Sequence, residues 1–513
     1  MRGEKSAEAV VARDVSTVRV KGRIQQPRSS PGHSMGVKRQ QGSGDQKDLF
    51  DEALMASLRH DRTGDGGTGP GLHVEPQSST AWKRQRTLTK ALMEEIAGSA
   101  NLNRAYARVK ANKGAAGVDG MSVTDLLPWI KVNRDRLIVS LIEGSYQPTT
   151  VRGVEIPKPG GGVRQLGIPT VVDRLVQQAI AQVLEPILDP TFSASSFGFR
   201  PGRSAHHALA QAQRYVADGR QIVVDIDLEK FFDRVNHDVL MARLARRIGD
   251  KRLLAIIRRF LQAGLMQGGV VIERHEGTPQ GGPLSPLLAN LLLDDLDKEL
   301  ERRGHRFCRY ADDCNIYVRS QAAGERVMAS VVAFLESKLR LKVNVQKSAV
   351  APVMERSFLG HRLLFDGRIG IAPKSLDRAK AKLRHLTRRN RGIALERMIA
   401  DVNGFTTGWV TYFRHASCKG TLGELDEWLR RKLRCVRLKQ CKRAKPMSDF
   451  LRKQGVPAWR TWSLAASGKG WWRCAASHTA HEAMPNAWFE AIGLVALSAH
   501  HAKLQPAGNR RVR

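Results

Sequence analysis

The pattern of apolar and polar positions predicts ordered structure from about residue 81 onward. Apolar residues first recur at helical spacing between Leu88 and Ala100. Short apolar runs of strand type then alternate with helical segments as far as about Ile371, which predicts an α+β core. Beyond that point the spacing is helical, and the sequence predicts three long helices, at residues 376–389, 394–415 and 422–443.

The last of these helices is predicted to be apolar on one face and basic on the other. Thr421 and Glu424 have the spacing of a capping box that would open it. Its polar face carries five basic residues with almost no acidic partner four positions later: Arg430, Arg431, Arg434, Arg437 and Lys439. A solvated charged face is the ordinary interpretation of such a pattern. The lack of acidic partners favours a surface that contacts phosphate.

Residues 1–80 show no sustained apolar period and are rich in Gly, Ser, Pro and Gln. This composition is typical of segments that cannot bury enough apolar surface to fold. We therefore expect a mostly disordered N-terminal extension with one short helix at residues 48–59.

Positive charge is the main anomaly of the composition. The 513 residues include 84 Lys and Arg against 49 Asp and Glu, a formal charge of +35. The excess is uneven, with +2 in residues 1–80, +13 in residues 81–373 and +20 in residues 374–513. Charge of this size repels itself, and a polyanion such as nucleic acid would relieve the repulsion.

Other features exclude several classes of protein. No apolar stretch approaches the roughly 18 residues that a membrane span requires, and residues 1–15 lack the apolar segment of a secretory signal. The six Cys include no CxxC pair, which favours reduced thiols over a disulfide framework or a zinc ribbon. We expect a cytosolic protein with no membrane partner.

Two acidic pairs are candidates for metal binding. Residues 221–227 read as a strand that places Asp225 and Asp227 on one face. Asp312 and Asp313 lie between two strand-like runs and would form the tip of a hairpin. Carboxylates with no His nearby suit Mg²⁺, which takes one or two of them and completes its shell with water and phosphates. Bringing the two strands together would build a two-metal site for phosphoryl transfer.

Either pair alone also has an ordinary structural interpretation. Asp312 and Asp313 could form a polar β-turn, and Asp225 with Asp227 could be a solvent-facing or helix-capping pair. The motifs that surround the two pairs favour the catalytic interpretation.

Seven motifs in order resemble the group II intron reverse transcriptase/maturase family, from about Trp82 to the C-terminus. They are Ile156–Pro169 (IPKPGGGVRQLGIP), Ser196–Arg203 (SFGFRPGR), Asp225–Asp233 (DIDLEKFFD), Gly277–Pro286 (GTPQGGPLSP), Tyr310–Asp313 (YADD), Asn344–Ser348 (NVQKS) and Phe358–His361 (FLGH). Each motif alone is a weak signal, but seven in the family's order are hard to obtain by chance.

The resemblance implies roles for the acidic residues. The family's metal-binding aspartate is followed five residues later by an aromatic, which selects Asp227 with Phe232 rather than Asp225. Asp227 and Asp312 would be catalytic metal ligands, and Asp313 would complete the cluster. The implied cofactor is Mg²⁺, two ions per active site, with Mn²⁺ able to substitute.

The resemblance also implies a nucleotide site. Lys158 and Arg164, on a fingers hairpin, would grip the triphosphate, and Gln280 would lie beside the nucleotide and template. Phe232 would lie under the incoming sugar and exclude a 2′-hydroxyl, whereas its neighbour Phe231 is expected in the core. Lys347 would protonate the leaving pyrophosphate, with an exposed structural lysine as the open alternative.

The implied fold is a right-hand polymerase of α+β class. Fingers and palm, an antiparallel sheet plus helices, would occupy residues 81–373, followed by a helical thumb (maturase domain X) at 374–450. A small basic region at 451–513 resembles the family's DNA-binding region. The basic face of helix 422–443 would then bind RNA.

The implied function is that of an RNA-directed DNA polymerase that also assists splicing and supports intron mobility by target-primed reverse transcription. Its partners would be group II intron RNA, an RNA template with a DNA primer, dNTPs and target DNA, in a bacterial cytoplasmic ribonucleoprotein. Two alternatives stay open. One is a domesticated reverse transcriptase for phage defence, CRISPR acquisition or sequence diversification, and the other is a non-enzymatic splicing chaperone.

Two departures from the family stand out in this sequence. Many members end in an HNH endonuclease with paired cysteines, and no such segment is present here, whereas the extension at residues 1–80 has no counterpart in the family's core. Cys474, His478 and His481 have a spacing that could bind a metal, but no fourth ligand is evident.

Overall fold

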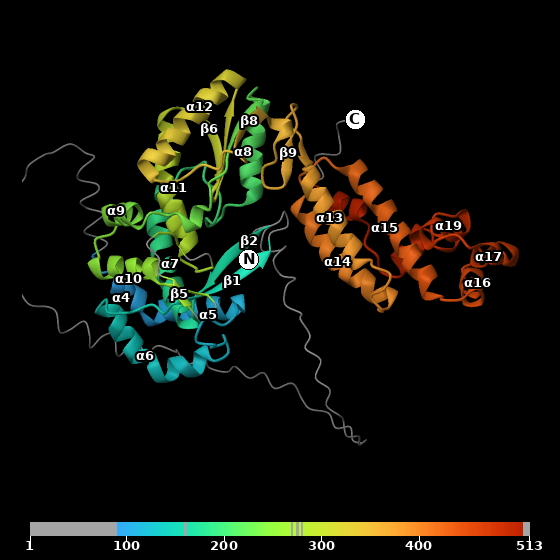
Figure 1. The fold of residues 1–513 in the computed structure, drawn as a ribbon, viewed down its shortest axis with the longest axis horizontal. Coiled ribbons are helices and arrows are strands. Elements are labelled where there is room, and N and C mark those ends of the chain that lie inside the picture. The colour runs from blue at the N-terminus through green and yellow to red at the C-terminus, as the bar shows by residue number, and fades with distance from the viewer. Residues whose placement is uncertain (1–89, 158–161, 268–269, 273–275, 279–280, 506–513) are drawn as a thin grey trace, which may run out of the picture. The chain divides into compact units, whose positions relative to one another are not determined.

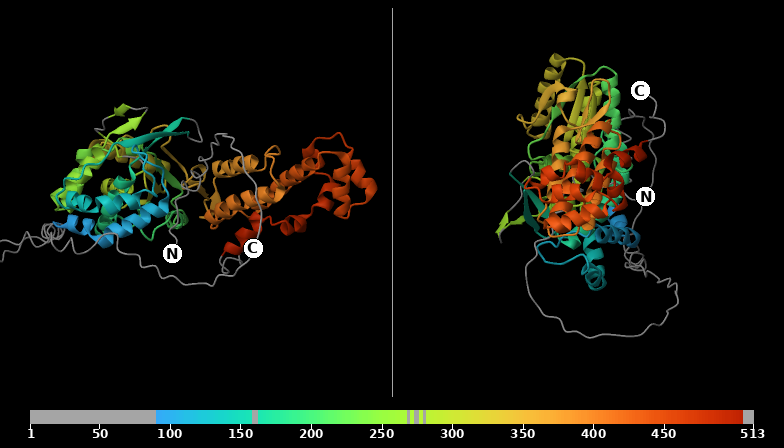
Figure 2. Two further views of the ribbon diagram at one scale, coloured as in Figure 1. Left: turned by 90° about the horizontal axis from the view of Figure 1, so that it is seen from below. Right: turned by 90° about the vertical axis from the view of Figure 1, so that its right-hand side faces the viewer.

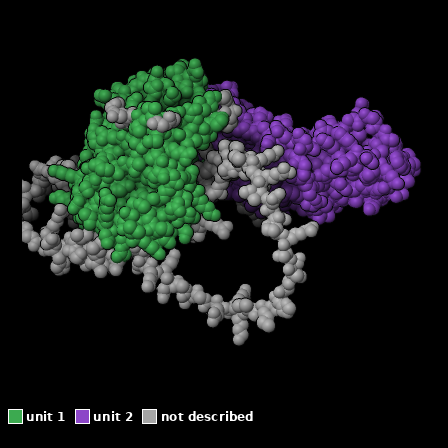
Figure 3. Space-filling view, turned by 60° about the horizontal axis from the view of Figure 1, so that its bottom comes forward, with its two compact units in different colours: residues 1–208, 224–316, 322–350 green, residues 209–223, 317–321, 351–513 purple. Residues whose placement is uncertain are grey.

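The computed structural model describes residues 90–157, 162–267, 270–272, 276–278 and 281–505. The expected disordered extension at residues 1–80, with its short helix, lies outside the described residues. The described chain forms two compact units (Figure 3). The first unit comprises residues up to 208, 224–316 and 322–350, and the second comprises 209–223, 317–321 and 351 onward.

Helices and two four-stranded sheets make up the chain as far as Pro352 (Figure 1). The helices are α4 Leu92–Ala97, α5 Ser99–Asn112, α6 Leu126–Ile142, α7 Val171–Leu188, α8 Ala205–Ala217, α9 His237–Arg247, α10 Lys251–Gln262, α11 Ser285–Arg302 and α12 Gln321–Phe334. The strands are β1 Val151–Pro157, β2 Val163–Ile168, β3 Ile222–Ile226, β4 Leu265–Gln267, β5 Val270–Ile272, β6 Arg306–Tyr310, β7 Asp313–Val318 and β8 Ala349–Pro352.

The first sheet has the strand order β2-β1-β4-β5. β1 and β2 form an antiparallel hairpin in which Ile156 lies opposite Arg164. β1 and β4 are parallel, with Val151 opposite Leu265, so one parallel pair joins the two antiparallel pairs of this sheet. Parallel neighbours need a long crossover connection, and the helices and strands between β1 and β4 provide one.

The second sheet has the order β6-β7-β3-β8, so β3 lies in its interior. The predicted strand at 221–227 and hairpin at 307–318 are confirmed as β3 and as β6 with β7. The predicted alternation along β3 holds only in part, because Val223 is buried together with Val224 and Ile226. A strand covered on both faces reads as a continuous apolar run, which explains this difference.

The second unit is largely helical. It contains the two-stranded antiparallel sheet of β9 (His361–Leu363) and β10 (Ile369–Ile371). Its helices are α13 Pro373–Leu386, α14 Leu395–Tyr412, α15 Lys419–Gln440, α16 Ala444–Lys453, α17 Ala458–Ala465, α18 Trp471–Cys474, α19 His478–Ala483, α20 Asn486–Ala491 and α21 Leu497–Leu504. The long helices α13, α14 and α15 lie next to one another (Figures 1 and 2).

One cluster of buried hydrophobic side chains extends through this unit, from Leu383 in α13 to Leu497 in α21. Helices of the expected thumb and of the expected C-terminal region therefore share a core. The domain boundary near residue 450 stays a prediction.

Helix α15 begins earlier than the sequence pattern indicates. It starts at Lys419, with Cys418 as a cap residue that makes no side-chain capping bond. Cys418 is buried in the core, and its carbonyl accepts the amide of Leu422, so the helix is held one turn upstream. The predicted capping box of Thr421 and Glu424 is therefore wrong, because both residues lie inside the helix.

The buried carboxylate of Asp426 connects α15 to α21. It accepts hydrogen bonds from the amides of Leu497 (2.8 Å) and Ser498 (3.0 Å) and from the Ser498 hydroxyl (2.7 Å). The first amides of a helix have no partner within that helix. α15 thus supplies the cap for a helix that lies 71 residues further along the chain.

Within the part of the chain that the structure describes, no helix combines the length and the apolar character needed to cross a membrane.

Candidate active site

Asp227 directly follows the interior strand β3 and is held there through its backbone. Its amide donates to the Ser348 hydroxyl (3.0 Å), and its carbonyl accepts from the amide of Asn344 (2.8 Å). These bonds explain why the NVQKS motif accompanies the aspartate in sequence. The side chain of Lys347, 66% exposed, brings its Nζ to 3.5 Å from an Asp227 carboxylate oxygen. Lys347 is therefore positioned to balance carboxylate charge at this end of β3.

Asp312 and Asp313 lie at the turn between β6 and β7, as the hairpin pattern predicts. Because β7 and β3 are neighbours in the sheet, this turn belongs to the same sheet as the strand that leads to Asp227. Electrostatics around Cys314 support the proximity. Burial raises the pKa of the Cys314 thiol, and the carboxylates of Asp225 and Asp313 are among the charges that raise it further. Acidic groups from both strands thus act on one buried thiol.

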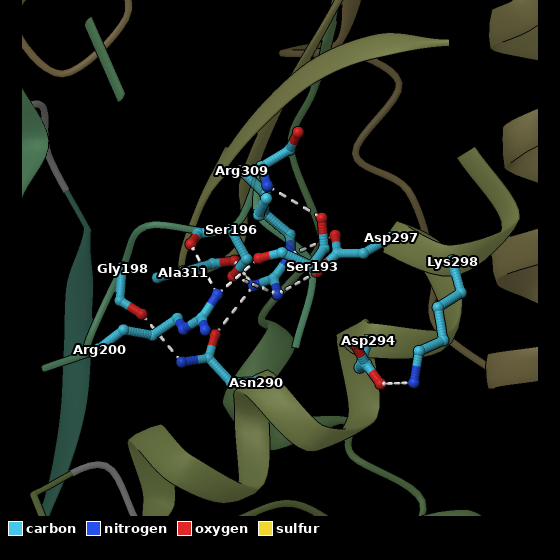
Figure 4. A network of polar contacts seen from close by, with 12 residues as sticks. Ser193, Ser196, Gly198, Arg200, Asn290, Asp294, Asp297, Lys298, Arg309 and Ala311 are labelled. Carbon is cyan, nitrogen blue, oxygen red and sulfur yellow. Dashed lines mark hydrogen bonds and ion pairs between the residues drawn. The ribbon is translucent and has the colours of Figure 1, made fainter. Parts of the chain in front are cut away.

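A buried arginine fixes the turn that carries Asp312 and Asp313 (Figure 4). Arg309 is 0% exposed, and its guanidinium makes a two-pronged ion pair with Asp297 of α11, at 2.7 and 2.6 Å. It also donates to the carbonyl of Ala311 (2.8 Å), the Asn290 side chain (3.0 Å) and the Ser196 hydroxyl (2.8 Å). One side chain therefore connects the turn to α11 and to the SFGFRPGR segment.

The protonation of this buried pair follows from its surroundings. Burial lowers the pKa of Arg309, but the carboxylate of Asp297 more than offsets that effect, so the guanidinium stays charged. Burial raises the pKa of Asp297, and Arg309 opposes that rise. A charge buried to this extent is stable only with its partner in place.

The backbone of the turn is also fixed by its surroundings. Ala311 has φ of +58°, a left-handed conformation that is uncommon for a residue with a Cβ. The side-chain amide of Asn290 (Nδ2) donates to the carbonyl of Gly198 (2.8 Å), and a Cβ at position 198 would overlap the Ala311 nitrogen. The glycine of the SFGFRPGR motif is therefore needed for the close approach of the two segments.

The metal-binding potential of the site rests on its carboxylates. Within the described ranges, no group of three or more His, Cys, Asp or Glu side chains is arranged to hold a metal ion. Asp227, Asp312 and Asp313 therefore do not form such a group by themselves. Mg²⁺ is commonly bound by one or two carboxylates plus water and substrate phosphates. The all-oxygen donors at ends of β3 and β7 fit that mode of binding, in which the nucleic-acid substrate would complete the shell.

The aromatic pair after Asp227 divides between core and surface. Phe231 is buried, as predicted, and Phe232 is half-buried with its ring edge-on to Phe231 at 5.1 Å between centroids. The carbonyl of Phe232 accepts the amide of Thr278 (2.6 Å), which joins this turn to the GTPQGGPLSP motif. The assignment of Phe232 to the sugar site stays a prediction.

Two nucleotide-binding candidates, Lys158 and Gln280, lie outside the described residues. Their flanking segments are described. Gly281, with φ of +131°, lies so close to β2 that a Cβ would be 2.6 Å from the Gly167 carbonyl oxygen. The Thr278 and Gly281 contacts connect the segment around Gln280 to the Phe232 turn and to the fingers hairpin. Arg164 lies exposed on β2 of that hairpin.

Comparison with known proteins identifies the fold. Residues 156–363 match the family described as reverse transcriptase (RNA-dependent DNA polymerase), and residues 376–455 match the group II intron, maturase-specific domain. Protein YkfC of Escherichia coli (strain K12) is 35% identical over 296 residues, which cover 50% of this chain and 77% of YkfC. The chain belongs to the group II intron reverse transcriptase/maturase family. The predicted α+β polymerase fold is thereby confirmed, and the family acts with divalent metal ions.

Other relatives match over shorter parts of their length. The group II intron-encoded protein LtrA of Lactococcus lactis subsp. cremoris is 38% identical over 202 residues, so the reverse transcriptase spans only 32% of LtrA. A chain of a partial Cas6-RT-Cas1–Cas2 complex is 29% identical, with 49% of this chain and 43% of that chain covered at a TM-score of 0.33. Together, the reverse transcriptase match and the maturase-specific match favour an intron-encoded enzyme over the domesticated and chaperone alternatives.

The basic face of α15 in the reverse transcriptase is only partly available to a partner. Arg434 is 4% exposed and donates two hydrogen bonds to the Met484 carbonyl, at 2.9 and 3.1 Å. Burial, with Arg430 nearby, lowers its pKa to about 10. The expectation that Arg434 faces phosphate is therefore wrong. The helical pattern did not reveal that C-terminal helices cover this face.

The other four basic side chains differ in their surroundings. The Arg431 guanidinium lies over the Trp472 ring at 4.0 Å, and that of Arg437 lies over the Phe450 ring at 4.1 Å. Arg430 is half-buried and Lys439 is exposed. Arginine stacked on an aromatic ring keeps its charge and can still contact phosphate. These four stay candidates for RNA binding.

The possible metal ligands near the C-terminus have separate partners. The Cys474 thiol donates to the Lys469 carbonyl, at 3.2 Å. His478 Nδ1 lies 2.6 Å from an Arg460 nitrogen, and His481 Nε2 lies 3.4 Å from an Arg434 nitrogen. The described part of the chain contains no metal-binding group built from these three side chains.

Proposed function

We propose that the protein copies RNA into DNA from a hydroxyl primer, with Asp227 and Asp312 holding two Mg²⁺ ions and Asp313 completing the acidic cluster. The observation that supports this most strongly is the place of these aspartates at ends of the neighbouring strands β3 and β7, with the hairpin turn held by the Arg309 network. The ions, when bound, would activate the primer 3′-hydroxyl and stabilise the pyrophosphate leaving group.

The protein's own groups orient the substrate and balance its charge. Arg164 on β2, together with Lys158, grips the triphosphate through charge-assisted hydrogen bonds. Lys347, beside Asp227, provides a proton for the departing pyrophosphate and screens the carboxylate. Gln280 contacts the nucleotide and template from the segment between Thr278 and Gly281.

The second unit binds nucleic acid in this proposal. The match to the maturase-specific domain and the charge of +20 in residues 374–513 support contact with group II intron RNA and with the template duplex. The protein then assists splicing and supports intron mobility at a DNA target, as part of a ribonucleoprotein in the bacterial cytoplasm. We assign fingers and palm to residues 81–373, the thumb to 374–450 and a DNA-binding role to 451–513.

A primer-extension assay tests the polymerase proposal. Purified full-length protein with a primed RNA template, dNTPs and Mg²⁺ should produce complementary DNA, and Mn²⁺ should replace Mg²⁺. EDTA should stop synthesis, and added Mg²⁺ should restore it. If protein with a normal circular-dichroism spectrum makes no DNA on any primed RNA, the polymerase proposal is wrong.

Replacement of Phe232 by Ala should weaken discrimination against ribonucleotides. The ratio of kcat/KM for a dNTP to that for the matching rNTP should fall by about tenfold to a hundredfold, because a hydrophobic pocket discriminates by shape to roughly that extent. Phe232→Tyr keeps the ring and should keep the ratio. Equal ratios in wild type and Phe232→Ala would remove Phe232 from the sugar site.

RNA affinity should fall steeply with salt. Four phosphate contacts, from Arg430, Arg431, Arg437 and Lys439, would contribute about −3 to the slope of log K against log salt, or at least about a fiftyfold loss between 50 and 200 mM. Lys439→Ala should reduce the magnitude of this slope by the contribution of about one phosphate contact. Arg434→Ala should instead lower the melting temperature and leave the slope unchanged. Affinity that is flat with salt would contradict the electrostatic basis of RNA binding.

A further inference from the structure

A basic cavity of about 650 Å³ lies within the second unit. Its walls come from the C-terminal end of α13 and the residues after it, from α15 and from α18. The lining residues are Arg384, Thr387, Arg388, Arg389, Asn390, Lys432, Cys435, Lys439 and Trp472. Ligand sites in proteins commonly have volumes of about 300–1,000 Å³. The cavity is therefore large enough for one nucleotide unit.

Positive charge dominates the lining. Five of its nine residues are Arg or Lys, and none is Asp or Glu. Burial lowers the pKa of the Lys432 ammonium, and the guanidinium groups of Arg384 and Arg389 lower it further. The carbonyl end of α13, near Leu386, offers only a fraction of a negative charge. Convergent cations with no carboxylate among them are unfavourable unless an anion joins them.

The cavity also has an aromatic wall. Trp472 is 42% exposed, and one face of its ring is covered by the Arg431 guanidinium at 4.0 Å. Two hydrogen bonds from Arg431 to the Trp472 carbonyl, of 3.1 and 3.3 Å, hold the residue in place. A Trp ring fixed beside a cluster of cations is the combination that binds an unstacked base and its phosphates.

We propose that this cavity binds one unstacked nucleotide of single-stranded RNA, with its base on Trp472 and its phosphates against Arg388 and Arg389. RNA is favoured because all the lining residues except Trp472 lie within the segment 376–455 that matches the maturase-specific domain. The proposal rests on the proposed contact with intron RNA and names a subsite for it. A continuous duplex keeps its bases stacked and cannot insert one into the cavity without opening.

Binding of a fluorescent single-stranded RNA to the full-length protein tests this subsite. Trp472→Ala should weaken binding by about fivefold to a hundredfold, and Trp472→Phe should retain most of the affinity. Replacement of both Arg388 and Arg389 by Ala should reduce the salt slope by about 1.4, the value for two phosphates of a single strand. RNA with 2-aminopurine at an unpaired position should lose fluorescence on binding to wild type and regain it with Trp472→Ala.

Matched variants control for general effects of Trp and Arg removal. Trp459→Ala removes a tryptophan of α17 that is 76% exposed and lies outside the cavity lining. Arg378→Ala removes an exposed arginine from the same helix, α13, that is also outside the lining. Both should bind RNA within about twofold of wild type.

Several outcomes would overturn the subsite. The subsite would be contradicted if Trp472→Ala and Trp459→Ala reduced the affinity for single-stranded RNA equally. It would also be contradicted if Trp472→Ala reduced the affinity for duplex RNA as much as that for single-stranded RNA. Single-stranded DNA that binds as tightly, with the same dependence on Trp472, would overturn the assignment to RNA. Adenosine monophosphate that restores 2-aminopurine fluorescence at the concentration where unlabelled RNA does so would assign the cavity to free nucleotides instead.

Primer extension by the same preparations separates this inference from the polymerase proposal. An unchanged extension rate on a pre-annealed template with Trp472→Ala, together with weakened single-strand binding, supports the subsite. If the wild type makes no DNA but shows binding that depends on Trp472, the polymerase proposal fails and the subsite stands. If the wild type extends the primer but Trp472→Ala does not change RNA binding, the subsite is contradicted and the polymerase proposal stands.

Discussion

Asp312→Asn should reduce RNA-templated DNA synthesis by about a thousandfold or more. The substitution keeps the size of the side chain and removes only its charge, so a metal ligand worth several kcal/mol in the transition state is lost. RNA affinity should stay within about twofold, because the turn lies in the first unit and the proposed phosphate contacts with RNA lie in the second. Single-turnover primer extension and RNA binding by fluorescence anisotropy measure the two quantities.

Asp225→Asn provides the matched comparison. Asp225 lies on β3, two residues before Asp227, and is half-buried like it. We expect Asp227→Asn to reduce DNA synthesis as much as Asp312→Asn does. Asp225→Asn should reduce it by less than about tenfold. A loss of synthesis with Asp225→Asn and not with Asp227→Asn would show that the ligand was assigned to the wrong aspartate of the strand.

Arg309→Met should destabilise the first unit by about 3–5 kcal/mol, because it leaves the Asp297 carboxylate buried without its partner. The loss should depend on pH. Burial raises the pKa of Asp297, and without Arg309 nothing as close opposes that rise. The protonated acid is then favoured in the folded state, so the free energy of unfolding of the variant should fall as the pH rises above about 4. Denaturant unfolding at several pH values measures this.

The double variant Arg309→Met with Asp297→Leu separates stability from positioning. Replacing both members of a buried ion pair by apolar residues commonly restores stability. The bonds to Ala311, Ser196 and Asn290 remain absent, so the turn loses its support. We expect stability near wild type and synthesis still reduced by about tenfold to a hundredfold. Recovery of full synthesis along with stability would show that Arg309 acts only on folding.

The sequence predicts the acidic strand and hairpin well for a physical reason. Their signals are local: alternation in residues 221–227, and two apolar runs on either side of Asp312 and Asp313. The family resemblance, which rests on the order of the motifs, then predicts that the two strands lie in one sheet. Even so, the sequence does not show that Asn344 and Ser348 hold the backbone of Asp227, because that contact joins segments more than a hundred residues apart.

Arg309 could not be found from its own strand. A single arginine between Cys308 and Tyr310 reads as an exposed residue at a strand edge. The stronger signal lies on α11, where Asn290, Asp294 and Asp297 recur at helical spacing among the leucines of its buried side. Polar residues along one line of a buried helix require polar partners. That line indicates a buried partner without naming it.

For Arg434 the sequence pattern gives a wrong prediction, because it places a buried side chain on the surface. Helical periodicity separates apolar from basic positions on α15, but it cannot show that a basic position is covered by the C-terminal end of α19, fifty residues later. The start of α15 at Lys419, after the buried Cys418, likewise removes the capping box that the local pattern predicts. Periodicity describes a helix alone, and these two features depend on its neighbours.

The cap that Asp426 supplies to α21 has a consequence for synthesis of the protein on the ribosome. Domains generally fold as units during translation, starting from the N-terminal side. Asp426 and the core around α15 obtain their last partners only when Leu497 and Ser498 emerge. We therefore expect the second unit to stay incomplete, with apolar surface of α14 and α15 uncovered, until Leu497 and Ser498 have been synthesised. During this delay the exposed apolar surface of the nascent second unit is prone to aggregation, so we expect it to be a site for chaperone binding.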